Sequence, residues 1–190
     1  MKKIRKIVNK HFKKSTGKLN KEVTNVINND IEDALKRANL LLADNKVSEP
    51  IIIKTADTTH ENVRFRLAKR KLHEFDVEFD HTLLTVLYFG ANDLTYYQTS
   101  INHVTGHVFE DVLGVVKYKD IVNNEVMITN DYDEKLDTTI SKLNVLLSLK
   151  DGDTINLTLR NHHEYNEDKY PNLLTTDEKY VIDTLKRAIN

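Results

Sequence analysis

The sequence contains no cysteine, and glycine accounts for only 5 of its 190 residues. Without cysteine the chain cannot form a disulfide, a thiolate metal site or a cysteine nucleophile. This absence fits a reducing compartment, and we expect the protein to be cytoplasmic. The few glycines form neither GxGxxG nor GxxxxGK[ST], which excludes these two phosphate-binding loops.

Long apolar runs are also missing. Stretches such as Leu40–Ala43 and Ile51–Ile53 fall far short of the ~20 residues of a membrane-spanning helix or the ~7–15 of a secretory signal. The chain has the basic start of a signal peptide, but polar residues such as Asn9 and Lys10 interrupt what would be its apolar part. We therefore expect neither a transmembrane segment nor a signal peptide.

What the sequence does contain is a strong split of charge. Lysine and arginine total 28 and aspartate and glutamate total 29, so the whole chain is nearly neutral. Residues 1–21 nevertheless carry nine cations and no acid. Residues 22–190 hold the remaining 19 basic residues (28 − 9) against all 29 acidic ones. A basic arm on an acidic body indicates that the arm binds either the body itself or an external polyanion.

The basic arm has a helical pattern. A helix over about residues 3–14 would place an apolar stripe between flanking cations. The stripe is Ile4, Ile7, Val8 and Phe12, and the cations are Lys2, Lys3, Arg5, Lys6, Lys10, Lys13 and Lys14. Such a helix suits an anionic membrane surface, a nucleic acid, or docking on the chain's own acidic body. The apolar stripe favours the membrane over the nucleic acid, because phosphate contacts alone would not require it.

Two further segments are predicted to be helical. Apolar residues recur every three or four positions over residues 20–45, which predicts an amphipathic helix capped by Asn20. Its stripe would pack on the protein's own core or form a surface for a homo-oligomer. A second helix is predicted over residues 59–74, starting at a capping box of Thr58 and Glu61.

The segment 46–74 also offers strand alternatives. Val63, Phe65 and Leu67 alternate with polar residues, as they would in a strand, and Ile51–Ile53 is either a short strand or a core plug. The basic residues between Arg64 and Lys71 are expected to form a solvated face.

After residue 73 the apolar period becomes two, which predicts seven strands. They cover residues 75–80, 82–89, 94–104, 107–118, 121–128, 140–149 and 154–160. Turn-forming residues separate them, most clearly Asp151-Gly152-Asp153, which is typical of a tight hairpin. Thr176 is predicted to cap a final helix, which has acidic residues in its first turn and basic residues in its last.

This order of strands and closing helix resembles bacterial pleckstrin-homology-like and GRAM-like domains over about residues 75–190. Two local features are also similar: Tyr118-Lys119-Asp120-Ile121, an aromatic-x-Asp-Ile step, and Leu147–Ile155, a hairpin with an Asp-Gly turn. The resemblance implies an α+β fold in which N-terminal helices precede a mostly antiparallel, seven-stranded curved sheet or barrel closed by a C-terminal helix. The chain would then divide into a basic amphipathic arm (1–17), a helical region (18–74) and a barrel-like domain (75–190).

Domains of this kind are mostly binding modules for anionic lipids or protein segments, and few are enzymes. Their lipid-binding members usually carry cations between the first two strands, where this chain has Asp80-His81. That departure argues against a lipid-headgroup pocket in the barrel and leaves the basic arm as the membrane contact. A protein partner would use an edge or groove of the barrel.

Residue types with catalytic or metal-binding chemistry form no set that predicts an active site. His103 and His107 flank a turn at Thr105-Gly106 and would bind zinc or sense pH only if their rings faced each other. One strand face is predicted to carry Glu74, Asp76, Glu78 and Asp80. Mutual repulsion should keep these carboxylates exposed rather than tuned for acid–base work. No serine lies in a G-x-S-x-G motif.

These observations lead to one main hypothesis and one alternative. The protein is expected to be a non-enzymatic, cytoplasmic binding or adaptor module that attaches to the inner face of the membrane through its basic arm. It would need no metal and no cofactor, and its protein partner is not identified by the sequence. The alternative is a nucleic-acid-associated accessory protein that uses the same arm.

Overall fold

The fold is that of a computed structural model, which describes residues 2–42, 49–59, 63–71, 74–134, 138–164 and 174–189. The helices are α1 (Lys2–Phe12), α2 (Lys21–Leu41) and α3 (Thr176–Ile189), with a short 3-10 helix, η2 (Tyr118–Asp120). The strands are β1 (Thr16–Lys18), β2 (Ile51–Ala56), β3 (Phe65–Lys71), β4 (Glu74–Phe79), β5 (His81–Phe89), β6 (Asp93–Asn102), β7 (His107–Val108), β8 (Val112–Lys117), β9 (Ile121–Asp133), β10 (Thr138–Leu149) and β11 (Thr154–Glu164). The predicted α+β class is confirmed.

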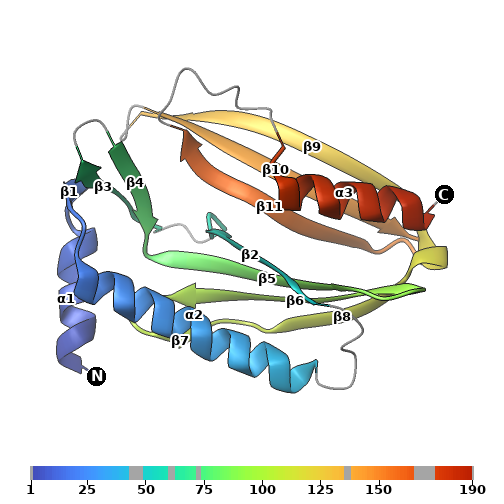
Figure 1. The fold of residues 1–190 in the computed structure, drawn as a ribbon, viewed down its shortest axis with the longest axis horizontal. Helices are drawn as coiled ribbons and strands as arrows, with labels where there is room; N and C mark the ends of the chain where they lie inside the picture. Colours follow the sequence, from blue (N-terminus) through green and yellow to red (C-terminus); the bar gives the residue numbers. More distant parts are fainter. Residues whose placement is uncertain are drawn as a thin grey trace.

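The described strands form three open sheets rather than one barrel (Figure 1). Their orders are β1-β3-β4, β2-β5-β6-β7 with β8 also on β6, and β11-β10-β9. The prediction of a single closed seven-stranded barrel was therefore wrong. Strand alternation shows which residues are extended but not which strands pair, and here β4 pairs with β3 instead of β5. Helix η2 separates β8 from β9, so the chain enters a new sheet at Ile121.

The largest core lies where α3 meets the β9–β11 sheet and the neighbouring end of the five-stranded sheet. Val181, Ile182 and Leu185 of α3 pack among buried residues of both sheets. The helix begins with a capping box in which the Thr175 hydroxyl accepts from the Glu178 amide at 3.2 Å, and the Thr175 amide donates to Glu178 at 2.7 Å. The cap is thus one residue before the predicted Thr176, and the closing C-terminal helix itself is confirmed.

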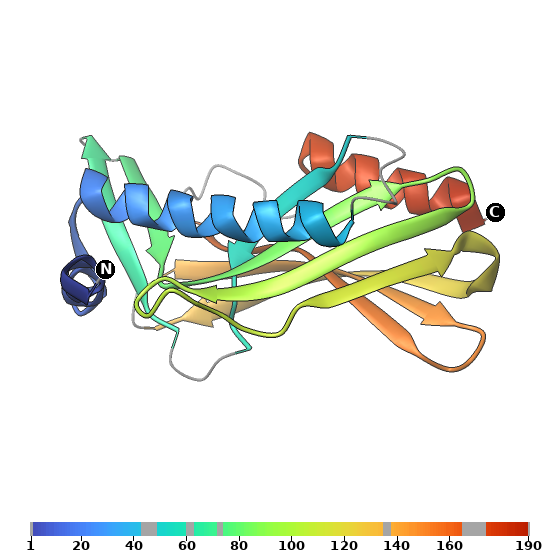
Figure 2. The same cartoon turned by 90° about the horizontal axis from the view of Figure 1, so that it is seen from below.

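Helix α2 covers the other face of the five-stranded sheet (Figures 1 and 2). Its side chains Ile31, Ala34 and Ala38 pack on the apolar face of β5 and β6. Asn20 caps it as predicted, because its side-chain oxygen accepts from the amides of Glu22 and Val23. The stripe that we considered as an oligomer surface is therefore used within the chain.

The predicted helix over residues 59–74 was wrong, and so was the description of residues 18–74 as helical. Strands β3 and β4 form an antiparallel hairpin there, and β1 joins β3 in parallel. The alternation of Phe65 and Leu67 was the correct signal, and β2 confirms the strand alternative for Ile51–Ile53. The Glu61 half of the predicted capping box lies outside the described residues.

Candidate functional site

Helix α1 forms as predicted, but its apolar stripe faces the body of the protein. Val8 is 0% exposed and Phe12 is 3% exposed, and both pack with Val23 of α2. Ile7 packs against the same cluster and Ile4 is half-buried. The prediction that Ile4, Ile7, Val8 and Phe12 face a membrane is therefore corrected, because Ile7, Val8 and Phe12 pack with residues of α2 and Ile4 is half-buried.

Arg5 is likewise turned inward, which corrects its assignment to the external anion-binding set. Its guanidinium makes two bonds of 2.6 Å to the carboxylate of Asp30 in α2 and donates to the carbonyl of His103 at 2.8 Å. Burial of Asp30 disfavours its charged form, but the hydrogen bonds from Arg5 and His103 outweigh burial and hold the pKa of Asp30 below its ordinary value. Arg5 thus ties α1 to both α2 and the turn after β6.

The turn after β6 fits closely against Arg5. Gly106 has a φ of +75°, and a Cβ atom there would lie 2.5 Å from an Arg5 nitrogen. The positive φ favours glycine at this position, and the Arg5 guanidinium, held by Asp30 and the His103 carbonyl, occupies the space that a side chain would need.

A hydrogen-bond chain continues from this ion pair into the sheet. The imidazole of His103 lies 2.9 Å from Asp30 through Nδ1 and 2.8 Å from the Thr82 hydroxyl through Nε2. This order of acid, imidazole and hydroxyl matches that of a nucleophilic triad. His103 is 0% exposed and Thr82 is 1% exposed, so a substrate could not reach the hydroxyl. These hydrogen bonds therefore serve to hold α2, β5 and the turn after β6 together.

The second histidine of the predicted pair lies elsewhere. His107 is exposed, and its ring packs edge-on against Phe109 at 4.7 Å between centroids. The two rings thus have separate partners, which removes the zinc alternative for the pair. Among the residues that the structure describes, no group of three or more potential metal ligands occurs.

The C-terminal end of α1 is held by a second charged cluster. His11 contacts Glu78 at 2.7 Å, and the buried guanidinium of Arg66 donates to the carbonyls of His11, Lys14 and Lys18. Gly17 leaves room for this guanidinium, because a Cβ atom there would lie 2.0 Å from it.

Further along the hairpin, Arg64 and His81 bond to the buried carboxylate of Asp80. Burial works against the charge of Asp80, yet these hydrogen bonds keep its pKa below the ordinary value. The predictions that Glu78 and Asp80 would be exposed, and that Arg64 and Arg66 would belong to a solvated face, were therefore wrong, whereas Lys69 is exposed as expected. The same predictions for the side chains of Glu74, Asp76, Arg70 and Lys71 lie outside what the structure describes.

The outer face of α1 is almost purely cationic. At about 100° per residue, its four lysines, Lys2, Lys3, Lys6 and Lys10, fall within a sector of about 100° opposite Val8. All four are exposed, and so is Lys13, which directly follows the helix. Lys14 and Lys18 are exposed just beyond the helix, and α1 lies at one end of the molecule, seen end-on in Figure 2. We call Lys2, Lys3, Lys6, Lys10 and Lys13 the lysine face.

The lysine face has the dimensions of a polyanion contact. The 11 residues of α1 span about 16 Å, and lysines three or four positions apart are about 5–6 Å from one another. Residues 1–21 contain no acid that would neutralise them. Six of the seven predicted anion-binding cations thus remain exposed, and Arg5 is the exception.

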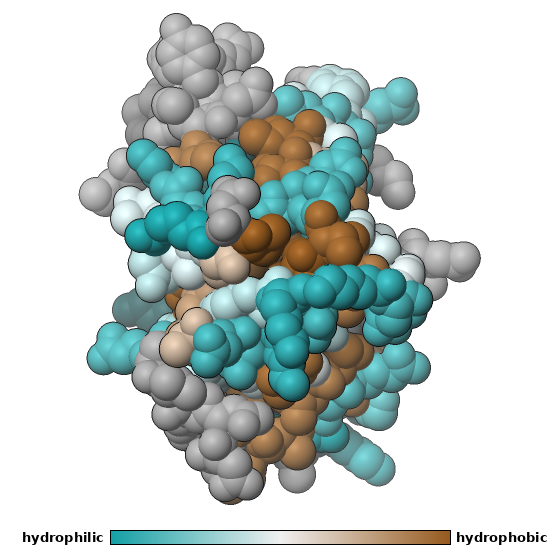
Figure 3. Space-filling model, turned by 90° about the vertical axis from the view of Figure 1, so that its right-hand side faces the viewer, coloured by the Kyte–Doolittle hydropathy of each residue, from teal (hydrophilic) through white to brown (hydrophobic). Residues whose placement is uncertain are grey.

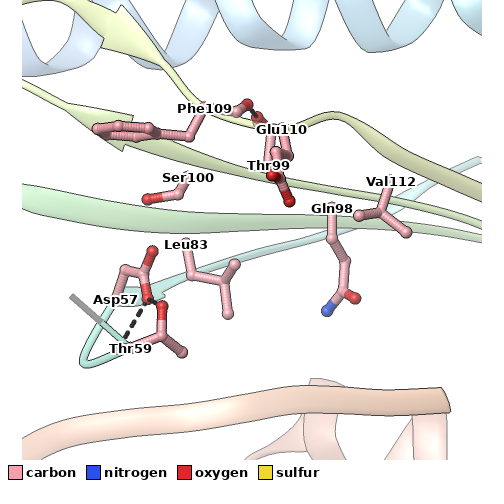
Figure 4. Close-up of a pocket in the computed structure, with 9 residues that line it drawn as sticks. All are labelled: Asp57, Thr59, Leu83, Gln98, Thr99, Ser100, Phe109, Glu110 and Val112. Atoms are coloured by element: carbon pink, nitrogen blue, oxygen red, sulfur yellow. Dashed lines mark hydrogen bonds between the residues drawn. The ribbon is translucent and has the colours of Figure 1, made fainter. Parts of the chain in front are cut away.

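A pocket on the five-stranded sheet was not predicted from the sequence (Figure 4). It lies near the end of β2 and has a volume of about 370 Å³. Asp57 and Glu110 both line it, although 53 positions separate them in the chain. The only local signal was the Asp57-x-Thr59 turn, in which the Thr59 amide donates to the Asp57 carboxylate at 3.0 Å.

Strand β8 leaves apolar side chains on the surface. Within the described ranges it pairs with β6 alone, and Val112, Leu113 and Val115 are all exposed. Figure 3 shows hydrophobic surface on the side of the molecule where β8 ends and α3 terminates. The adaptor hypothesis expects a protein partner to bind at an edge of a barrel. In the open sheet, β8 is an exposed apolar strand that could take the place of that edge.

The comparisons with known proteins do not assign a family. A scan against family models, a search of curated proteins and a search of solved structures each found no match. None of the helices in the described ranges is long and apolar enough to cross a membrane. The functional argument therefore rests on the lysine face and the edge of β8.

Proposed function

We propose that the protein is a non-enzymatic binding module that attaches to an anionic membrane surface through the lysine face of α1. The observation that carries this proposal is the gathering of four exposed lysines on one side of a helix whose other side is docked, with exposed Lys13 directly after them. Because the apolar stripe is buried, the contact is electrostatic and peripheral, without insertion between lipids. Each lysine near such a surface contributes about 1 kcal/mol, so five give a weak but useful attachment that salt reverses.

A vesicle experiment tests this attachment. The full chain is co-sedimented with vesicles of neutral lipid alone and with vesicles that contain anionic lipid. The variant Lys3→Gln/Lys6→Gln/Lys10→Gln should lose most of the binding to anionic vesicles. The matched control Lys54→Gln/Lys117→Gln/Lys179→Gln removes the same charge from exposed positions outside α1 and should bind as the wild type does. Equal losses in both triple variants would refute the proposal.

The burial of the stripe also supports the second candidate, a nucleic acid. The apolar residues that favoured a membrane now serve the protein's own core, and a row of lysines alone suits phosphates. Duplex and single-stranded oligonucleotides should therefore be tested beside the vesicles. If nucleic acid is the partner, removing one lysine contact should reduce the slope of log K against log salt by about 0.9.

A further inference from the structure

Strand β8 is an edge strand that lacks the usual protection against pairing. Residues 112–116 read Val-Leu-Gly-Val-Val, without charge or proline, and their ladder with β6 has no register shift. Edge strands of proteins that stay monomeric usually carry a charge, a proline or a bulge, because unpaired backbone groups bind other strands. The side chains of Val112, Leu113 and Val115 are 46%, 43% and 52% exposed. This edge therefore has the composition of a contact surface.

The hydrogen bonds of β8 show which of its backbone groups are free. The Tyr118 amide donates to the Asn92 carbonyl at 3.0 Å, in the same register as the β8–β6 ladder. Residues that bond alternate with residues that do not along one edge of an antiparallel ladder. The even-numbered residues of β8 therefore bond to β6, and the amides and carbonyls of Leu113, Val115 and Lys117 point away from it. Within the described ranges β8 pairs with β6 alone, so these groups face an open edge.

The sequence of this edge is complementary to itself. Residues 111–117 read Asp-Val-Leu-Gly-Val-Val-Lys. When a second copy lies antiparallel with its Gly114 opposite Gly114, Leu113 lies opposite Val115 of the copy, and Asp111 lies opposite Lys117 of the copy. Both pairs join odd-numbered residues, whose backbone groups are the free ones, so hydrogen bonds can form between the strands. The two glycines form a non-hydrogen-bonded pair, where the strands approach most closely.

Charge selects this register among those that the backbone allows. Moving the copy by two residues in either direction leaves Lys117 opposite an apolar residue instead of an acid. In the chosen register the acidic end of each β8 meets the basic end of the other. Asp111 is already paired with Arg37, but the exposed Glu110 beside it leaves this end with a net negative charge. Opposite charges across a strand pair stabilise it, whereas like charges would oppose it.

We propose that the protein forms a two-fold symmetric homodimer in which the β8 strands of two copies pair along their free edges. The two five-stranded sheets then become one continuous sheet. A two-fold contact uses the same surface on both copies, as a self-complementary edge requires. The contact of one six-residue strand is small beside the about 800 Å² per partner of a standard interface, so the dimer is weak and depends on concentration. No residue of α1 takes part, so this proposal is independent of the proposed membrane attachment.

Sedimentation velocity of the full chain, run from low to high micromolar concentration, tests the dimer. The wild type should shift from monomer towards dimer as the concentration rises. Val115→Lys places a cation in the middle of the free edge and should weaken dimerisation about tenfold or more. Val122→Lys changes an apolar residue of β9 that is 58% exposed, and this matched control should dimerise as the wild type does. A wild type that stays monomeric, which would leave the edge to a strand of another protein, or equal losses in both variants would refute the proposal.

The absence of cysteine allows a test of the register by crosslinking. Opposite residues of a hydrogen-bonded pair have Cα atoms about 5.5 Å apart, within reach of a disulfide. The double variant Leu113→Cys/Val115→Cys should therefore form a covalent dimer on mild oxidation, seen on a non-reducing gel. Each single variant places its thiol opposite a residue other than cysteine and should crosslink slowly. Single variants that crosslink as fast as the double variant would contradict the assigned pairing.

Discussion

The two ends of the chain are attached to the molecule by different forces. The C-terminal unit, β9–β11 with α3, is held by a large apolar core and one buried ion pair between Arg160 and Glu178. The N-terminal unit, α1 and β1 with the β3–β4 hairpin, has a small apolar cluster of Val8, Phe12 and Val23. It is also tied by polar side-chain contacts: Arg5 pairs with Asp30, His11 hydrogen-bonds with Glu78, and Arg64 pairs with Asp80.

This difference indicates how each unit responds to its surroundings. Apolar packing depends on buried area and is nearly insensitive to pH, whereas ion pairs require their carboxylates to be charged. The N-terminal unit, which carries the lysine face, should therefore be the first to loosen in acid. The C-terminal unit should set the stability of the whole fold.

The largest effect is expected from a cavity in the C-terminal core. Leu157 is fully buried among residues of the β9–β11 sheet and α3. Leu157→Ala should lower the free energy of unfolding by about 2–5 kcal/mol, measured by urea denaturation. Ile7→Ala, a truncation at a half-buried position of α1, should cost less. The reverse order would show that the apolar contacts of α1 contribute more to stability than the C-terminal core does.

A smaller and more local effect is expected from Arg66→Met. The methionine keeps the apolar stem but loses the bonds to three backbone carbonyls, and unpaired buried groups of this kind cost about 1–3 kcal/mol. Hydrogen exchange should accelerate in α1 and β1 and stay unchanged in β10. Arg187→Met, at an exposed position of α3, serves as the control. Uniform acceleration over the chain would contradict the separation into two units.

Acid should loosen the N-terminal unit. The pKa values of Asp30 and Asp80 are held below normal, so their contribution is complete above the unfolded-state pKa of about 4 and is lost as pH falls below it. Hydrogen exchange of α1, followed between pH 5 and pH 3 and corrected for the intrinsic rate, should accelerate more than that of β10. Asp30→Asn should be less stable at neutral pH and should show a weaker dependence on acid. Equal acceleration of α1 and β10 would disagree with this account.

The smallest effect on stability is expected from the lysine face. Lys10→Gln replaces an exposed side chain and should leave the thermal unfolding midpoint unchanged. The same variant should bind anionic vesicles more weakly than wild type. A lower midpoint would mean that Lys10 stabilises the fold and is not free for a partner.

The sequence correctly located helices and strands where apolar residues recur at a regular spacing along the chain. Alternation located most of the strands after residue 73, and the apolar period of α2 together with Asn20 located that helix and its start. The positive φ of Gly152 agrees with the predicted hairpin turn. Such signals are local, because they depend on neighbours one to four positions away.

Pairings between distant segments could not be predicted in this way. Arg5 and Asp30 are 25 positions apart, and His11 and Glu78 are 67 apart. Without these partners the apolar stripe of α1 and Glu78 of β4 both looked solvent-facing. The pocket combines four separate segments for the same reason, so only the turn at Asp57 gave any indication of it.

The docking of α1 has a consequence for any partner that the lysines meet. A loose basic tail must lose conformational freedom when it binds, and this loss weakens the complex. Here Arg5 and Arg66 have already fixed the helix, so the positions of the ammonium-bearing side chains are set by the fold rather than by the partner. Under the proposed function, the helix would act as a rigid template, whose charge spacing would distinguish anionic surfaces by their geometry as well as by their charge density.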